Sequence, residues 1–406
     1  MITIANVSKV FGLDRRAATP LLAAADPSAA VGEAGGHLAV SDVSLEVARG
    51  EFFVIVGLSG SGKSTLLRMV NGLVEPTAGT VSVDGQRLDT LSAAELRTVR
   101  NRSMAMVFQH FGLFPHRTVA QNVGYGLRIR RKPTAADRER VDWAIAQVGL
   151  TPWRDHYPQE LSGGMKQRVG LARALATDAD ILLMDEPFSA LDPLIRTEMH
   201  DLLTTLQHEL ERTIVFVTHD LNEAMKLGDR ILVMRDGHAV QLDSAAAMIG
   251  TPADGYVSRF LANVDRSRVL TAEMVMRPPL LVAHPGESPQ AVLGRLERHE
   301  ANGSYVVDEV TERILGVVRD GTLAELVRAG TPTIASALVQ EFETVAGDRP
   351  LVELCRRVGQ YCVPLAVTDP SGRLRGVVPR AALLAALADD HPEPARPASR
   401  PEVAHA

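Results

Sequence analysis

Residues 57–65 have the sequence Gly-Leu-Ser-Gly-Ser-Gly-Lys-Ser-Thr, which follows the apolar run 52–56 and precedes a helical pattern over residues 66–70. This spacing, between a predicted strand and a predicted helix, is that of a phosphate-binding loop. The alternative is a glycine-rich surface turn. The phosphate-binding prediction covers Gly57, Leu58, Ser59, Gly60, Ser61, Gly62, Lys63, Ser64 and Thr65.

The residue types of this loop suit the binding of phosphate. Gly57, Gly60 and Gly62 permit the torsions and the close approach that converging N–H groups need at a helix N-terminus. Lys63 supplies a mobile positive charge for the β- and γ-phosphates, and Ser64 supplies a hydroxyl for Mg²⁺. The sequence therefore predicts a nucleotide-phosphate site.

The composition is that of an ordinary globular protein. The chain has 406 residues, of which 46% are hydrophobic and 23% charged, and its formal net charge is −6. This length indicates two or three domains, and the negative charge gives no reason to expect a nucleic-acid partner. Two cysteines, Cys355 and Cys362, are too few for a disulfide scaffold, which suits a reducing compartment. Because no apolar run reaches 18 residues and no signal peptide is evident, we expect a chain that does not enter a membrane.

The N-terminal region predicts two strands around an irregular segment. Residues 2–10 alternate apolar and polar side chains, as an edge strand does, and end at Phe11, which could stack on an adenine or simply pack. Residues 13–37 are rich in Ala, Gly, Pro and Asp without a steady period, which predicts a loop or poorly ordered insertion. Residues 38–47 alternate again.

Four short apolar runs are each followed by polar or glycine-rich sequence. They cover residues 52–56, 104–108, 181–184 and 214–217, and runs of this kind predict strands covered on both faces. Ligands of open α/β sheets bind at the carboxyl ends of the strands. The residues expected at that edge are Lys63, Gln109, Asp185, Glu186 and His219.

The polar residues at this edge have definite chemical uses. Asp185 can hold Mg²⁺ through water, and Glu186 can act as general base for the attacking water. Gln109 could contact Mg²⁺ or that water, and His219 could contact the γ-phosphate. The alternatives are a solvated acidic turn for the carboxylates and a structural hydrogen bond for Gln109 and His219.

A second candidate anion site opens another predicted helix. Ser162, Gly163 and Gly164 precede the helical pattern that continues through Leu175, and helix N-termini bind anions. Ordinary capping by Ser162 is the alternative. The spacing alone does not explain why one chain needs two such sites.

Together these motifs make the chain similar to an ATP-binding cassette. Two longer stretches, residues 163–173 and 188–199, resemble the ATPase subunits of glycine betaine/proline importers. The matching motifs are the Walker A loop 57–65, the Q-loop Gln109, the signature 161–167, the Walker B run 181–186, the D-loop 189–192 and the switch His219.

The resemblance implies an α/β P-loop ATPase domain over residues 1–265, with a helical subdomain at about 112–160, that hydrolyses ATP with Mg²⁺. It implies a head-to-tail homodimer in which ATP lies between the Walker A loop of one chain and Ser162, Gly163 and Gly164 of the other, which would explain the second anion site. It also implies nucleotide contacts for Phe11 and Asp192, and a permease contact that includes residues 111–116.

Residues beyond 266 repeat themselves at an offset of 60. Each copy has the pattern strand, turn, strand, helix, which predicts one small duplicated α+β domain over residues 266–390, followed by a disordered tail at 391–406. The recurring residues are Val307, Arg313, Gly316, Val317, Val318 and Leu323, repeated as Val367, Arg373, Gly376, Val377, Val378 and Leu383.

Residues 274–279, before the first copy, resemble the opening of a CBS motif, and tandem CBS motifs imply a sensor of ionic strength or of a nucleotide such as cyclic di-AMP. CBS motifs that hold an adenosyl ribose usually have a Thr or Ser and then an Asp after Gly-(Ile/Val)-(Ile/Val). Those places are taken by Arg319 and Thr322 in one copy and by Pro379 and Ala382 in the other, which makes ribose recognition doubtful. Residues 266–390 hold 14 Arg, no Lys and 16 Asp or Glu, so no bulk attraction to anionic lipid follows.

We therefore expect an ATPase, peripheral at the cytoplasmic face of the cell membrane, that energises import of a quaternary-amine osmolyte through a separate permease, with a substrate-binding protein or domain as a further partner. The alternatives are an importer ATPase for another solute such as an amino acid, a soluble cassette acting on DNA or ribosomes, and a nucleotide sensor with a vestigial cassette. The solute is not encoded in this chain.

Overall fold

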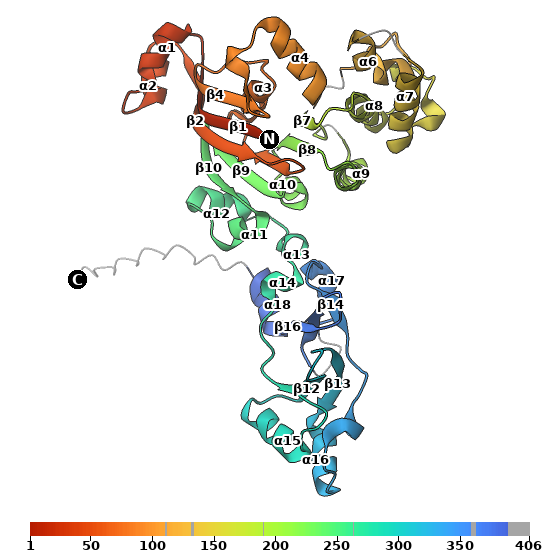
Figure 1. Ribbon diagram of the computed structural model, residues 1–406. Coiled ribbons are helices and arrows are strands. Elements are labelled where there is room, and N and C mark those ends of the chain that lie inside the picture. Colours follow the sequence, from red (N-terminus) through yellow and green to blue (C-terminus); the bar gives the residue numbers. More distant parts are fainter. Residues whose placement is uncertain (110–111, 131–133, 190, 263, 359–362, 389–406) are drawn as a thin grey trace, which may run out of the picture. The chain divides into compact units, whose positions relative to one another are not determined.

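The computed structural model divides into two compact units, residues 1–263 and 264–406 (Figure 1). Phe111, Cys362 and the tail predicted at 391–406 lie outside the described residues. The structure describes residues 1–109, 112–130, 134–189, 191–262, 264–358 and 363–388.

The N-terminal unit is built on a six-stranded sheet in the order β10-β9-β3-β8-β7-β6, in which only β10 is antiparallel to its neighbour. The four apolar runs predicted to be buried strands are β3, β6, β7 and β8. The bounds of the strands are β3 (Phe52–Val56), β6 (Met104–Val107), β7 (Ile181–Asp185), β8 (Thr213–Thr218), β9 (Arg230–Arg235) and β10 (His238–Asp243).

A second, antiparallel sheet has the order β2-β1-β4-β5. Its strands are β1 (Ile2–Phe11), β2 (His37–Val47), β4 (Ala78–Val83) and β5 (Gln86–Arg87). The prediction of an edge strand at residues 2–10 is wrong, because β1 pairs with both β2 and β4. Alternation reveals that one face is buried, but it carries no information on how many neighbours a strand has.

The segment 13–37 is also corrected by the structure, because it folds into two short helices, α1 (Arg15–Leu21) and α2 (Pro27–Glu33). Asp14 and Asp26 cap them by accepting hydrogen bonds from backbone N–H groups. Ala18 and Val31 pack with Val10 and Leu38 of the neighbouring strands. Two turns are too short to display a helical period, which is why composition alone suggested a loop.

The remaining helices of this unit pack on the sheets or on one another. Helix α8 packs against α5, α6 and α7, and α7 buries Val141, Ala144 and Ile145. The bounds are α3 (Lys63–Val70), α4 (Ala93–Ser103), α5 (Val119–Val123), α6 (Tyr125–Arg130), α7 (Ala135–Gln147), α8 (Gly163–Ala176), α9 (Pro193–Leu210), α10 (Leu221–Leu227), α11 (Ala245–Gly250) and α12 (Gly255–Leu261), with the 3-10 turns η1 (Leu88–Thr90), η2 (Thr151–Trp153) and η3 (Pro158–Glu160).

The main core of the N-terminal unit lies between the two sheets, with α3 inside it. Ile4 and Val81 of the antiparallel sheet share one buried cluster with Leu66 of α3 and with Phe53 and Val217 of the parallel sheet. Burial of this kind fixes α3, and with it the loop that precedes it, against the carboxyl end of β3.

The C-terminal unit contains two three-stranded sheets of the same topology, β11-β12-β13 and β14-β15-β16. Tyr305 and Val317 of the first copy share a buried cluster with Val363, Ala366 and Val377 of the second, so the predicted repeat is present. The bounds are α13 (Arg266–Val269), α14 (Ala272–Val275), β11 (Val282–Ala283), α15 (Pro289–Arg298), β12 (Gly303–Val307), β13 (Ile314–Arg319), α16 (Asp320–Arg328), η4 (Ile334–Ala337), β14 (Thr344–Ala346), α17 (Leu351–Leu354), β15 (Leu365–Thr368), β16 (Leu374–Val378) and α18 (Arg380–Leu387).

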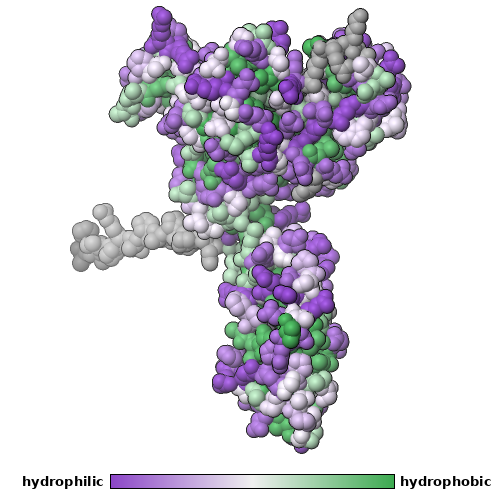
Figure 2. All heavy atoms as spheres, in the orientation of Figure 1, coloured by the Kyte–Doolittle hydropathy of each residue, from purple (hydrophilic) through white to green (hydrophobic). Residues whose placement is uncertain are grey.

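The surface of the described residues mixes polar and apolar side chains. On the face drawn in Figure 2, hydrophilic residues predominate over the N-terminal unit. Within the described parts of the chain, none of the helices combines the length and the apolar character that a membrane span requires.

Candidate functional site

The loop 57–65 joins the carboxyl end of β3 to the first turn of α3, as the sequence predicts. Two of its glycines allow the backbone to approach its neighbours. A Cβ at Gly57 would lie 2.2 Å from the carbonyl oxygen of Met234, and a Cβ at Gly62 would lie 2.3 Å from that of Ala39. Gly62 also has a φ of +96°, which L residues rarely adopt. The loop therefore follows a path that larger residues could not take.

Lys63 is a buried cation within this loop, with only 4% of its surface exposed. Its Nζ donates hydrogen bonds to the carbonyl oxygens of Gly57 at 2.8 Å and Leu58 at 2.9 Å. Burial lowers the pKa of Lys63, although the nearby charges of Glu186 and Asp185 oppose that shift. The ammonium is thus held inside the curve of the loop, where a phosphate oxygen would replace water.

Ser61 supplies an independent sign that the loop fits phosphate. Its Oγ is buried and has no hydrogen-bond partner among the described residues. A buried hydroxyl without a partner is costly, and a phosphate oxygen in the loop would satisfy it. The loop geometry, Lys63 and Ser61 together fit the phosphates of a nucleotide.

Ser64 and Asp185 are brought together from positions 121 residues apart. The Ser64 Oγ donates a hydrogen bond to Asp185 Oδ1 at 2.6 Å, and Arg68 Nη2 lies 3.2 Å from Asp185 Oδ2. The described residues contain no group of three or more His, Cys, Asp or Glu side chains that could hold a metal. Mg²⁺ bound to phosphates needs only one or two carboxylates and a hydroxyl, so Ser64 and Asp185 fit that ion.

Glu186 and His219 meet at the same edge of the sheet. Glu186 Oε2 and His219 Nδ1 lie 3.0 Å apart, and Glu186 has a φ of +44°, a conformation that non-glycine residues adopt at a cost. Its backbone N–H donates to the carbonyl oxygen of Val217 at 3.0 Å. The backbone strain thus lies at the residue whose carboxylate contacts His219.

Gln109 follows β6 at this edge, as predicted. Its Nε2 donates a hydrogen bond to Ser189 Oγ at 3.4 Å, and Ser189 Oγ in turn donates to the carbonyl oxygen of Glu186 at 3.1 Å. Gln109 is exposed, so it can also contact a ligand. Ser189 thus links Gln109 to the backbone of Glu186.

Three further predicted contacts stand at the ends of their secondary-structure elements. Phe11, 42% exposed, ends β1 and pairs in register with His37. Ser162 caps α8 by accepting a hydrogen bond from Met165 N at 3.3 Å, and Asp192 caps α9 by accepting one from Ile195 N at 3.1 Å. Within the described ranges, neither a hydrogen bond nor an ion pair joins residues 162–164 to the loop 57–65. One copy of the chain thus keeps its two candidate anion sites unconnected.

Arg68 is a site residue that sequence reasoning missed, and for Ser189 the sequence indicated a D-loop position but no contact. Arg68 lies four positions after Ser64 on α3, and side chains at that spacing share a helix face, so the helical period could have revealed it. Ser189 belongs to the D-loop, but its contact with Gln109 spans 80 residues and has no local signal.

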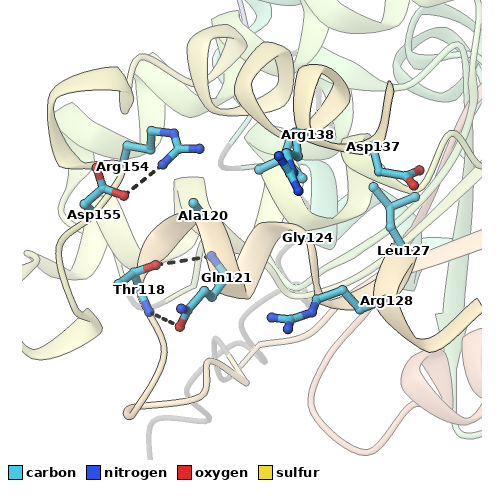
Figure 3. Close-up of a pocket in the computed structure, with 11 residues that line it drawn as sticks. Thr118, Ala120, Gln121, Gly124, Leu127, Arg128, Asp137, Arg138, Arg154 and Asp155 are labelled. Carbon is cyan, nitrogen blue, oxygen red and sulfur yellow. Dashed lines mark hydrogen bonds and ion pairs between the residues drawn. The ribbon is translucent and has the colours of Figure 1, made fainter. Parts of the chain in front are cut away.

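A pocket of about 420 Å³ lies in the helical part of the unit, apart from the loop 57–65 (Figure 3). Its wall combines apolar and charged side chains: Leu127 and Val141 lie beside Arg128, Arg138 and Arg154. Figure 3 shows that the capping hydrogen bonds between Thr118 and Gln121 shape one side of it.

The C-terminal unit has a separate pocket of about 420 Å³ between its two copies. Its lining includes Pro279, Tyr305, Pro364 and Pro379, and Tyr305 donates a hydrogen bond to the carbonyl oxygen of Pro364 at 2.7 Å. Arg319 stands where ribose-binding CBS motifs usually have a Thr or Ser, and it forms an ion pair with Glu341.

Comparison with known proteins agrees with this geometry. Residues 40–189 match the family described as ABC transporter, and residues 272–329 match the CBS domain. The chain is 43% identical to the glycine betaine/carnitine transport ATP-binding protein of Listeria monocytogenes, over 95% of this chain and 97% of that protein. It is 42% identical to the glycine betaine/proline betaine transport system ATP-binding protein of Escherichia coli, over 95% and 97%.

Solved structures resemble the N-terminal part. An ATP-binding cassette in a dimeric post-hydrolysis state, bound to ADP and Pi, matches with a TM-score of 0.51 and 32% identity, over 60% of this chain and 99% of that one. A cassette from Clostridium perfringens, part of an ABC transporter complex, matches with a TM-score of 0.53 and 27% identity, over 64% and 93%.

Proposed function

The chain belongs to the family of ABC transporter ATP-binding proteins, and from this membership we propose that it hydrolyses ATP to drive uptake of a quaternary-amine osmolyte through a separate permease. The relatives whose names mention glycine betaine, carnitine, proline betaine and choline support this class of solute. An amino acid or another small solute is the alternative.

The observation that carries the proposal is the pair Glu186 and His219 beside the loop that holds Lys63. ATP would place its phosphates against the backbone N–H groups of the loop, with Lys63 Nζ and Ser61 Oγ as further donors. Glu186 Oε2 then accepts a proton from the attacking water. His219 is positioned to donate to the γ-phosphate as negative charge develops there.

Mg²⁺ is the metal that suits Ser64 and Asp185. It would neutralise charge between the β- and γ-phosphates, with the Ser64 hydroxyl and the Asp185 carboxylate as its protein contacts. Arg68 holds the other carboxylate oxygen, which fixes the orientation of Asp185. Gln109, at the same edge, would contact the ion or the water.

Two copies of the chain are proposed to act together. Ser162, Gly163 and Gly164 form an anion site at the start of α8 that the loop of the same chain does not use. A head-to-tail dimer would bring this site to the nucleotide held by the partner. Phe11 and Asp192 are proposed as further nucleotide contacts in that dimer. The dimeric state of the related cassette supports this arrangement.

The segment that includes residues 111–116 is the proposed contact for the permease, together with the pocket in the helical part. Its lining combines Leu127 and Val141 with charged side chains of both signs, since Arg154 pairs with Asp155, and such a surface suits a short amphipathic segment. The chain would then work at the cytoplasmic face of the membrane through its partner. The substrate-binding protein or domain would be reached only through that permease.

The C-terminal unit is proposed to regulate the cassette. Its pocket between two copies offers a place for a small ligand, and an ionic-strength response is the alternative. Because Arg319 is engaged by Glu341, and Pro379 carries no donor, recognition of a ribose has little support from these positions.

Glu186→Gln tests the proposed hydrolysis. The amide retains the shape of the side chain but cannot accept the proton, so ATP should bind with unchanged affinity while turnover falls by at least about 100-fold. Glu209→Gln, which changes an exposed glutamate of α9, is the matched control and should hydrolyse ATP normally. Unchanged turnover in Glu186→Gln would remove Glu186 as the base.

Solute specificity requires the complete transporter. Hydrolysis by the complex reconstituted with permease and binding protein should rise when glycine betaine is added. Stimulation by an amino acid, without stimulation by any quaternary amine, would contradict the proposed solute class and favour an amino-acid importer.

A further inference from the structure

Arg196, in the first turn of α9, bridges two segments of the site. Its Nη2 donates a hydrogen bond to the carbonyl oxygen of Leu191 at 3.1 Å. Its Nη1 lies 3.5 Å from Asp220 Oδ2, and its Nε lies 3.7 Å from Glu223 Oε1. Leu191 belongs to the D-loop, whereas Asp220 directly follows His219, so one guanidinium contacts both segments.

The acceptors on the far side of Arg196 control the backbone around His219. The Thr218 hydroxyl donates to Glu223 Oε2 at 2.5 Å and accepts from Asp220 N at 2.9 Å. Thr218 and Asp220 are the two chain neighbours of His219. A displacement of Glu223 or Asp220 would therefore move the residue that lies 3.0 Å from Glu186.

Glu223 is a buried carboxylate, 6% exposed, that depends on its partners. Burial alone would raise its pKa, but hydrogen bonds from His200 and Thr218, together with the charge of Arg196, keep the pKa below its usual range. A buried charge that loses a partner is strongly destabilised. Glu223 is therefore held mainly by His200 and Thr218, with Arg196 as a further positive charge beside it.

The contacts of Arg196 are uneven. Its bond to Leu191 is well formed, whereas its distances to the two carboxylates exceed the roughly 2.8 Å of a charge-assisted hydrogen bond. Arg196 Nε is buried without a hydrogen-bond partner among the described residues. The guanidinium is thus anchored at the D-loop and has room to tighten against Asp220 and Glu223.

We propose that Arg196 is a positioning residue that transmits the position of the D-loop to His219, so that engagement of this loop by a second copy of the chain aligns His219 for hydrolysis. The inference rests on the proposed function, because it requires a dimer that hydrolyses ATP. The planar fork of arginine can serve three acceptors at fixed angles, which a lysine cannot do.

The test compares Arg196→Gln and Arg196→Lys in the full chain. In Arg196→Gln, kcat should fall by about tenfold because His219 is misplaced, while KM for ATP changes by less than about twofold. The Hill coefficient for ATP should fall towards unity, because each site no longer senses the other. Arg196→Lys retains the charge and should recover only part of kcat.

Arg230→Gln is the matched control. Arg230 also pairs with a buried glutamate, Glu51, at 3.2 Å, and donates to the carbonyl oxygen of Glu46 at 3.1 Å, but it lies at the amino end of β9. This variant should keep both kcat and the Hill coefficient. An equal loss in Arg230→Gln would mean that Arg196 acts only through stability, and the link would be refuted.

The remaining outcomes separate the two proposals. If Arg196→Gln unfolds, the variants Arg196→Lys and Asp220→Asn test the positioning role of Arg196 instead. Both must then lower kcat without raising KM for ATP. Wild-type kcat and Hill coefficient in the Arg196 variants, with hydrolysis still abolished by Glu186→Gln, would overturn this inference alone. A wild-type chain that does not hydrolyse ATP would overturn the proposed function instead.

Discussion

At the scale of single residues, the site holds groups in states that cost stability. Lys63 is an almost buried cation whose hydrogen bonds within the described residues go to two backbone carbonyl oxygens. Glu186 has a left-handed backbone, and Ser61 buries a hydroxyl without a partner among the described residues. Such costs are tolerated where a ligand uses the groups concerned.

Lys63→Met separates the stabilising role of this residue from its binding role. Methionine fills a similar volume without a buried charge, so the thermal unfolding midpoint should stay the same or rise. ATP affinity should fall by more than about tenfold, because the phosphate loses its ammonium donor. Isothermal titration and thermal unfolding measure the two quantities.

Lys226→Met is the control, because Lys226 pairs with Asp201 on the surface away from the loop. It should bind ATP as the wild type does. Wild-type affinity in Lys63→Met would contradict the assignment of the loop as a phosphate site.

At the scale of elements, the loop between β3 and α3 is defined by its sterics. Gly62 and Gly60 both have positive φ values, +96° and +82°, but only Gly62 has a backbone atom close to where a Cβ would lie. Gly60 and Gly62 therefore both have a left-handed backbone, but only Gly62 also lacks space for a side chain.

Gly62→Ala and Gly60→Ala should differ in their effect on unfolding. Gly60→Ala should cost about 1 kcal/mol, from the left-handed backbone alone. Gly62→Ala should cost more than about 3 kcal/mol, because the clash is with the Ala39 carbonyl oxygen, which cannot rotate away. Urea unfolding of the full chain, followed in the N-terminal unit, measures the difference. Equal costs would mean that the close approach at Gly62 is relieved by movement of β2.

At the scale of the whole molecule, Gly163 at the start of α8 has no steric reason to be glycine within a single copy. A Cβ at Gly163 would meet nothing within 4 Å, and alanine is a better helix former than glycine. A requirement for glycine at this position would therefore come from another molecule.

Gly163→Ala should leave the stability of the chain within about 1 kcal/mol of the wild type. In the Glu186→Gln background, where ATP is held without hydrolysis, it should weaken the ATP-dependent dimer seen by light scattering. Gly170→Ala, on the same helix and also without a neighbour within 4 Å, should leave the dimer unchanged. A normal dimer in Gly163→Ala would argue against the head-to-tail arrangement.

Local patterns in the sequence predicted most of the fold and much of the site. The apolar runs identified the buried strands, and the residues after them identified Gln109, Asp185, Glu186 and His219, because parallel strands present their carboxyl ends at one edge. The offset of 60 identified the repeat in the C-terminal unit. In each case the information lies within a few residues of the chain, in torsions and in which face is buried.

Only the tertiary structure showed which elements and side chains contact one another. The internal position of β1 and the packing of α1 and α2 depend on which elements lie beside them. The hydrogen bond from Ser64 to Asp185 and the contacts of Arg196 join segments that are distant in sequence. A side chain specifies its own preference for burial and torsion, but its partner is chosen by the packing of the whole unit. For this reason the residues of the candidate site could be predicted from the sequence, whereas the contacts between them became visible only in the fold.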